Sequence, residues 1–200
     1  MVQPTKALGK FLSAVQAVER PVVVDLGPVV GSNLAFFGEH LGCKIFVEDV
    51  FKDVDRHAAG TLGGELPAHL AGRFTQADGS VDGILCWDLF DYLDRDATQA
   101  LIAQLVRMLR PDGALMAMFG GKPTEGASAE TFTRFVVVHS TSLECRAYPS
   151  KAARLKPLQN RDVQRFFEPL RITEQFLLKS NVREVVLRKP AQPWSAAASA

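Results

Sequence analysis

The sequence predicts a doubly wound α/β fold, in which a mostly parallel sheet ends in an antiparallel hairpin. This prediction rests on short apolar runs rich in β-branched residues, on helical periodicities between them, and on two strand-like segments that flank residues 179–181. Continuous apolar runs bounded by Pro and Gly are typical of strands that are buried on both faces, as in a parallel sheet. A chain of 200 residues is long enough for one such domain with additions.

Apolar periodicity, capping residues and Gly or Pro breaks place the individual elements. Up to residue 119 they are a helix over 5–19, a strand over 22–26, a helix from a cap at Ser32 or Asn33 to residue 40 or 41, a strand over 44–47, short helices within 50–57 and 66–73, a strand over 83–87, a helix from about 96 and a strand over 114–119. Later elements are short strands over 132–138 and 142–147, a helix from a cap at Asn160 to about 168, and a hairpin of 172–178 with 182–187. In such a sheet, ligands are expected beyond the carboxyl ends of the strands.

The chain is predicted to form a single domain over residues 1–190. Within it, residues 121–160 are expected to be an inserted hairpin or lid region, because a polar loop precedes the two short strands. Residues 191–200, which end in a run of Ser and Ala, are expected to be a disordered tail.

Composition excludes several classes of protein. Hydrophobic residues make up 47% and charged residues 22%, as in globular proteins, which argues against wholesale disorder. Three cysteines without a Cys-x-x-Cys pair favour a reducing compartment, and the four histidines have no metal-ligand spacing. No apolar run approaches the ~20 residues of a membrane span, and the N-terminal segment lacks a signal-peptide core. We therefore expect a cytoplasmic protein without a metal or a membrane contact.

The charges are unevenly distributed along the chain. Acidic residues prevail up to residue 120 and basic residues after it, although the net charge is only +1. One interpretation is that these are solvated faces of one domain, since the charges are spaced apart. Another is a basic surface in the second part that binds an anionic small molecule.

Three segments together resemble the class I S-adenosylmethionine-dependent methyltransferases. The first is the loop 23–31, with Asp25, Gly27 and Gly31; the second is the strand 45–49, which ends in two acids; the third is the tract 78–88 followed by the Leu-Arg-Pro-Asp-Gly turn at 109–113. The resemblance covers about residues 20–120 and implies a Rossmann-like sheet, S-adenosylmethionine as cofactor, and methyl transfer to a small-molecule acceptor. No Asn-Pro-Pro-Tyr-type motif follows residue 87, so nucleic acid is not expected as a partner.

The loop after the first strand can bind an anion for reasons of backbone chemistry alone. A strand that ends in glycine and opens a helix leaves free N–H groups at the positive end of the helix dipole, which favours a carboxylate such as that of the methionyl group. Gly27 permits a tight turn and Gly31 permits a close approach, because neither has a Cβ. Asp25 is expected to orient this loop or to meet the amino group of the ligand.

Other acids complete the predicted site. Glu48 or Asp49 is expected to bind the ribose hydroxyls, and the sequence leaves open which of the two does so. Asp78 is a weaker candidate for adenine recognition. Asp88 follows the strand 83–87 and is expected to face the substrate as a base or an orienting acid, with helix capping as the alternative.

The sequence departs from the family pattern in two places. Val29 stands where the family has its middle glycine, so the loop either follows a different path or has a narrower cofactor site. Between Asp49 and Asp82 there are too few residues for a full strand and helix, so the third strand is expected to be contracted or missing. These departures motivate an alternative function, a catalytically inactive methyltransferase fold that serves as a binding or scaffold protein. The oligomeric state stays open.

Overall fold

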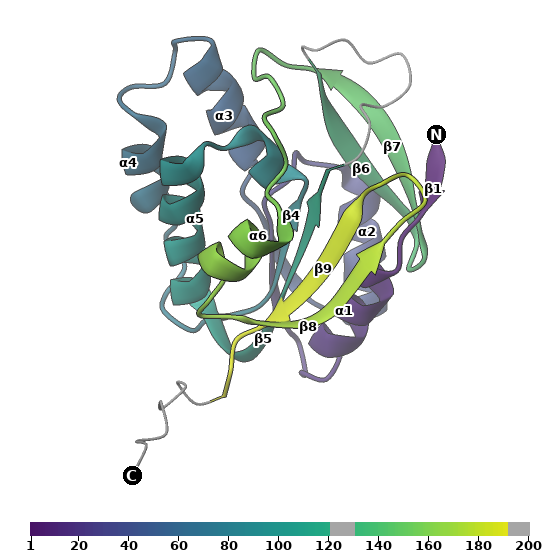
Figure 1. Ribbon diagram of the computed structural model, residues 1–200. Coiled ribbons are helices and arrows are strands. Elements are labelled where there is room, and N and C mark those ends of the chain that lie inside the picture. The colour runs from purple at the N-terminus through teal and green to yellow at the C-terminus, as the bar shows by residue number, and fades with distance from the viewer. Residues whose placement is uncertain (121–130, 192–200) are drawn as a thin grey trace.

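The computed structural model describes residues 1–120 and 131–191, so the predicted polar loop and most of the predicted tail lie outside the described residues. Its centre is a six-stranded mixed sheet (Figure 1). In spatial order the strands are β3 (Lys44–Val47), β2 (Val22–Asp25), β4 (Val81–Trp87), β5 (Leu109–Phe119), β9 (Arg183–Arg188) and β8 (Arg171–Leu177). The first four are parallel, and β9 pairs antiparallel with both β5 and β8. This confirms the predicted fold class.

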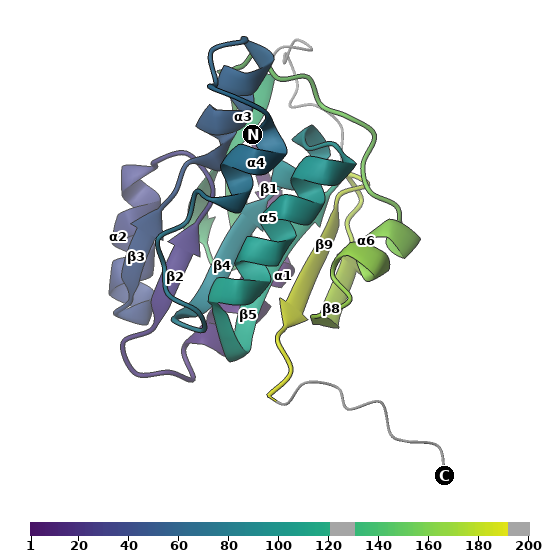
Figure 2. The same ribbon diagram turned by 90° about the vertical axis from the view of Figure 1, so that its left-hand side faces the viewer.

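Helices cover both faces of the sheet (Figure 2). One face packs against α3 (Val50–Ala58), α4 (Leu66–Ala71), α5 (Arg95–Met108) and α6 (Asn160–Phe166). The other face packs against α1 (Ala7–Val15) and α2 (Gly31–Leu41). Each face has its own cluster of buried apolar side chains, which explains why the central strands read as continuous apolar runs. Among the described residues, none of the helices has the length and apolarity of a membrane span.

The third strand expected of the family is absent between α3 and β4. Residues 59–80 contain only α4 and irregular chain, so β3 is the edge of the sheet. The prediction of a contracted or missing strand is therefore confirmed. The segment still contributes to the edge that it flanks, because Arg73 and Gln76 both bind Glu48.

A small second sheet lies over the carboxyl end of the large one. It consists of β1 (Val2–Pro4), β7 (Ser142–Pro149) and β6 (Thr131–His139), in that order. The hairpin of β6 and β7 was predicted, whereas β1 was not, because three residues before a helix carry no alternating pattern. Apolar side chains of this sheet, among them Phe135 and Leu143, belong to the cluster that contains α1 and α2.

Asn33 attaches this hairpin to α2. The prediction that Ser32 or Asn33 caps α2 is wrong, because the cap position is Val30 and no side chain caps it. The Asn33 side chain instead donates to the carbonyl of Phe135 at 2.9 Å and accepts from the N–H of Val137 at 2.8 Å. An amide has a donor and an acceptor of its own, so it can pair with a strand as another strand does. Similarly, α6 has Gln159, not Asn160, at its cap position.

Candidate functional site

The carboxyl ends of β2, β3 and β4 lie at one edge of the sheet, where the sequence placed the site. Asp25, at the end of β2, is paired in register with Val47 on one side and Leu85 on the other. Asp25, Glu48, Asp49 and Asp88 therefore follow neighbouring strands at this edge. Asp78 does not join them: it precedes β4, at the strand's amino end, and its exposed side chain binds Arg107 at 2.8 Å.

Asp25 braces the loop that follows it. Its Oδ1 accepts a hydrogen bond from the N–H of Gly27 at 2.9 Å and another from the indole Nε1 of Trp87 at 2.7 Å. Burial raises the pKa of Asp25 to about 6, although both hydrogen bonds oppose this rise. Of the two roles expected for Asp25, the structure thus shows the loop-orienting one.

Trp87 covers Gly27. A Cβ placed on Gly27 would lie 2.8 Å from Cδ1 of the indole, so only glycine allows this approach. Trp87 is buried, its φ of 51° lies in the left-handed region, and its ring stacks on that of Phe135 with centroids 5.3 Å apart. The absence of a Cβ at Gly27 therefore lets the Trp87 indole, and not a bound ligand, lie directly against the loop.

The rest of the loop leaves the helix start open. Val29 has no positive φ and is 57% exposed, so this valine does not narrow the site. Gly31 is the first residue of α2, and a Cβ placed there would have no atom within 4 Å. There is thus open space beside Gly31, while the N–H groups of Asn33 and Leu34 donate to the carbonyl of Val30.

The structure distinguishes the two acids after β3. Asp49 caps α3, since its Oδ1 accepts a hydrogen bond from the N–H of Lys52 at 3.3 Å. Glu48 is bound through both carboxylate oxygens, by Arg73 Nη1 at 2.5 Å and by Gln76 Nε2 at 2.6 Å. Arg73 also pairs with Asp53 of α3. Sequence reasoning missed Arg73 and Gln76, because they lie in the irregular segment that replaces the third strand.

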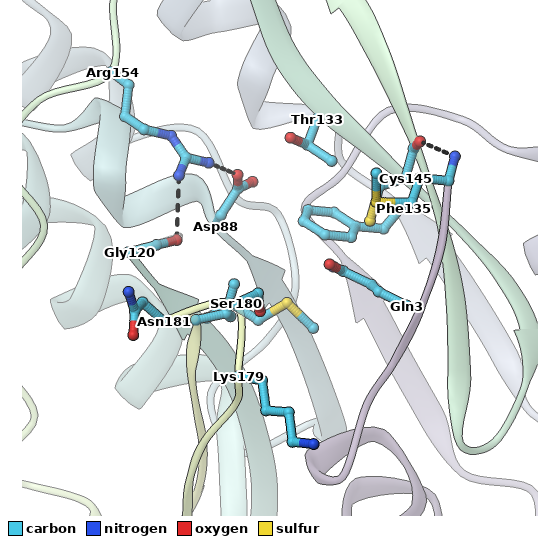
Figure 3. A pocket seen from close by; sticks show the side chains of 13 residues that line it. Gln3, Asp88, Gly120, Thr133, Phe135, Cys145, Arg154, Lys179, Ser180 and Asn181 are labelled. Atoms are coloured by element: carbon cyan, nitrogen blue, oxygen red, sulfur yellow. Dashed lines mark hydrogen bonds and ion pairs between the residues drawn. The ribbon is translucent and has the colours of Figure 1, made fainter. Parts of the chain in front are cut away.

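Beside this edge, beyond β4 and β5, there is a cavity of about 430 Å³ (Figure 3). Its walls come from the carboxyl ends of β4 and β5, the β8–β9 turn, the small sheet and the segment around Arg154. Apolar side chains such as Met118 and Phe135 line it together with polar groups such as Thr133 and Ser180. We call this space the β4–β5 cavity.

Asp88 is the buried carboxylate of the β4–β5 cavity. It is 2% exposed, its Oδ2 accepts a hydrogen bond from Arg154, and its Oδ1 has no hydrogen-bond partner among the described residues. Burial raises the pKa of Asp88 to about 6, while the charge of Arg154 lowers it. A buried carboxylate oxygen without a partner favours a ligand that donates a hydrogen bond.

Arg154 connects Asp88 to a second buried acid, Asp91. Arg154 donates to the carbonyl of Gly120 at 3.2 Å and lies 3.3 Å from Asp91. Asp91 is fully buried, and its Oδ2 accepts from the N–H of Gly120 at 2.9 Å. Burial, together with the charge of Asp88, raises the pKa of Asp91 to about 7, against the effect of Arg154. The helical turn Leu89–Tyr92 turns Asp91 inward.

Comparison with known proteins shows a likeness in structure only. No protein-family model matches the sequence, and neither does any curated protein. A S-adenosylmethionine-dependent methyltransferase from Clostridium acetobutylicum is similar with a TM-score of 0.55 and 10% identity, over 90% of this chain and 91% of that one. The N-methyltransferase NodS from Bradyrhizobium japonicum is similar with a TM-score of 0.53 and 15% identity, over 92% and 94%.

A third similar structure contains ligands. It is the 1,6-didemethyltoxoflavin-N1-methyltransferase of Burkholderia thailandensis, with 1,6-didemethyltoxoflavin and S-adenosylhomocysteine bound. Its TM-score is 0.52 at 15% identity, over 92% of this chain and 77% of that one. At such identities the likeness establishes the fold, and the chemistry has to be argued from the residues of this chain.

Proposed function

Because the chain has the fold of the class I S-adenosylmethionine-dependent methyltransferases, we propose that it transfers a methyl group from S-adenosylmethionine to a small molecule. The acceptor would bind in the β4–β5 cavity. One observation carries this proposal: Asp88 lines this cavity at the carboxyl edge of the sheet, where the fold class binds ligands, and one of its buried carboxylate oxygens has no hydrogen-bond partner among the described residues.

The residues fit the cofactor at two of three positions. The open space beside Gly31 at the N-terminus of α2 suits the methionyl carboxylate, because the positive end of the helix dipole favours an anion. Glu48 is proposed for the ribose hydroxyls, because it directly follows β3, the strand next to β2. Its two oxygens already accept hydrogen bonds from Arg73 and Gln76, so the ribose would use their remaining lone pairs. At Gly27, however, the indole of Trp87 occupies the space next to the loop.

Asp88 is proposed as the base. S-adenosylmethionine, when bound, supplies an electrophilic methyl group. Asp88 Oδ1 would accept the proton of an acceptor hydroxyl or amine, while Arg154 holds the other carboxylate oxygen and so orients the group. A pKa of about 6 lets this carboxylate be ionised at neutral pH yet remain basic enough for proton transfer. Walls such as Phe135 and Met118 exclude water and position the acceptor, an effect worth ~7–11 kcal/mol in favourable cases.

The acceptor is proposed to carry a hydrogen-bond donor next to an apolar body. The donor would face Asp88, and the apolar part would contact Phe135. An anionic group on the same molecule would meet Lys179 at the edge of the cavity, whose side chain extends away from Asp88 (Figure 3). We further propose a cytoplasmic location, because Cys43, Cys86 and Cys145 are all free thiols.

Binding of S-adenosylhomocysteine, followed by isothermal titration and thermal shift, tests the proposal. Wild-type protein and Asp88→Asn are expected to bind it with affinities that agree within about twofold, because Asp88 is assigned to the acceptor. When the protein and S-adenosylmethionine are incubated with a library of small hydroxyl and amine compounds, mass spectrometry should show a product 14 Da heavier, as expected for replacement of hydrogen by methyl. Asp88→Asn should lower the rate by about 10²–10⁴-fold.

The alternative, a fold kept only as a binding module, predicts a different result. The compared structures, which are all named as methyltransferases, do not favour it. The observation on its side is the position of Trp87 against Gly27. Cofactor binding without transfer to any acceptor in the library, together with recovery of a stable protein partner, would support this alternative and contradict ours.

A further inference from the structure

Trp87 lies between the two halves of the proposed site. Its indole rests on Gly27 on the cofactor side, and its ring stacks on Phe135, which lines the β4–β5 cavity. Trp87 is the last residue of β4, and its φ of 51° is rare for a residue with a bulky side chain. Such a backbone outlier at a ligand edge is a reason to look for a functional role.

The Trp87 indole occupies the two positions that the cofactor would need beside this loop: the hydrogen-bond acceptor of Asp25 and the space next to Gly27. Its Nε1–H donates to Asp25 at 2.7 Å, where the amino group of the methionyl moiety is expected, and its ring fills the approach to Gly27. The cofactor and the indole therefore cannot occupy this place together. We propose that Trp87 is a gate: its indole closes the cofactor site in this structure, and it leaves Asp25 and Gly27 when S-adenosylmethionine binds. This inference rests on the proposed function.

Exchange of the indole for the cofactor is chemically favourable at Asp25. The indole offers a buried carboxyl group one neutral donor, whereas an ammonium group offers a charge-assisted hydrogen bond. Burial without a positive charge is unfavourable for a carboxylate, so Asp25 would gain from the replacement. Burial also raises the pKa of Asp25, as expected for a carboxylate with only neutral hydrogen-bond donors.

The stack couples the gate to the hairpin. Phe135 stands on β6, and its own backbone carbonyl accepts a hydrogen bond from Asn33, in the first turn of α2. An indole that leaves Gly27 must slide along or displace the Phe135 ring. An acceptor in the β4–β5 cavity touches that same ring, so the state of the gate and the occupancy of the cavity should influence each other.

Tryptophan fluorescence can follow the gate directly. The chain has two tryptophans, Trp87 and Trp194, so Trp194→Phe makes Trp87 the single reporter. Titration of this variant with S-adenosylhomocysteine is expected to shift the emission to longer wavelength and to increase quenching by acrylamide, because a buried indole becomes more exposed.

Trp87→Phe tests whether the hydrogen bond between Trp87 and Asp25 opposes cofactor binding. It keeps an aromatic ring but removes the hydrogen bond to Asp25, so S-adenosylhomocysteine should bind about fivefold more tightly than to the wild type. Tyr148→Phe, which likewise removes the polar group of an aromatic side chain but lies on β7, is the control and should bind as the wild type does. Should Trp87→Phe fail to fold, Phe135→Leu loosens the stack and leaves the Asp25 bond in place, and it should also bind more tightly.

The outcomes separate the gate from the function. Binding with the expected emission change, or binding by Trp87→Phe alone, supports the gate. Equal affinity of Trp87→Phe and wild type, with Trp87 emission unchanged on binding, would overturn the gate while the proposed function stands. Absence of binding by both folded proteins would overturn the proposed function and the gate with it.

Discussion

Arg154 binds one carboxylate oxygen of Asp88, and no described residue forms a hydrogen bond with the other. The same guanidinium lies 3.3 Å from the buried carboxyl group of Asp91, so two acids share one basic group. The charge of Asp88 contributes to the raised pKa of Asp91. The stability of the folded protein should therefore depend on pH through this pair of acids.

Stability is expected to fall as pH rises from about 4 to about 7. The pKa is about 6 for Asp25 and Asp88 and about 7 for Asp91, against an ordinary value of 3.8. The folded chain then binds more protons than the unfolded chain in this range, and the free energy of unfolding decreases with pH. Thermal unfolding at pH 5 and pH 7.5 should show the higher midpoint at pH 5.

Asp91→Asn is expected to make this dependence on pH less steep, because it removes one buried titrating group. Asp96→Asn, an exposed carboxyl group in the first turn of α5, is the control. If Asp91→Asn retained the full difference between the two pH values, the assignment of this dependence to the acid pair would be wrong.

Gly27→Ala is expected to destabilise the protein by about 1–3 kcal/mol, as overpacking of a buried contact does. The cause is the indole of Trp87, 2.8 Å from the added Cβ. Gly31→Ala, which meets open space at the start of α2, should change the free energy of unfolding by less than about 1 kcal/mol. Urea unfolding measures both; equal effects would mean that Trp87 does not lie against Gly27.

Asn33→Ala should loosen the small sheet. The substitution leaves the carbonyl of Phe135 and the N–H of Val137 without their side-chain partner, at a cost of about 2–3 kcal/mol. Hydrogen exchange at Val137 is expected to become faster, whereas Ser32→Ala, an exposed position in the same turn, should leave it unchanged. Unaltered protection in Asn33→Ala would show that other contacts hold the hairpin on α2.

Substitution of the two acids after β3 should separate their roles. Glu48→Ala is expected to weaken S-adenosylhomocysteine binding by about tenfold, since it removes a charged hydrogen-bond acceptor from the proposed ribose site. Asp49→Asn keeps a capping side chain for α3 and should leave the affinity within about twofold. A larger loss in Asp49→Asn than in Glu48→Ala would assign the ribose to the other acid.

Much of the fold could be predicted because its signals are local. The run 22–26, the break at Gly42 and the hairpin around residues 179–181 each follow from neighbouring residues, and the structure places elements at all three. A contracted or missing third strand was also predictable, because few residues separate Asp49 from Asp82, and the structure shows that it is missing. The start of α2 was less predictable, because the Asn33 side chain that could have capped it binds the backbone of β6 instead.

The candidate site divides in the same way. Asp25, Gly27, Glu48 and Asp88 could be selected from the sequence, because each follows a strand that the apolar pattern identifies. Arg73 and Arg154 could not, since they come from irregular segments and reach their acids through contacts 25 and 66 residues apart. A local sequence pattern cannot predict a contact between residues so far apart in the chain.

By itself, the sequence determined the α/β order of elements, the strand ends at which acids and glycines collect, and the resemblance to the methyltransferases. Only the tertiary structure decided what those residues touch: Trp87 lies on Gly27, Asp49 caps a helix, and Asp88 lines a cavity with one buried oxygen that no described residue binds. The physical reason is that secondary structure depends on residues a few positions apart, whereas burial and side-chain pairing depend on segments that meet only after the sheet has formed.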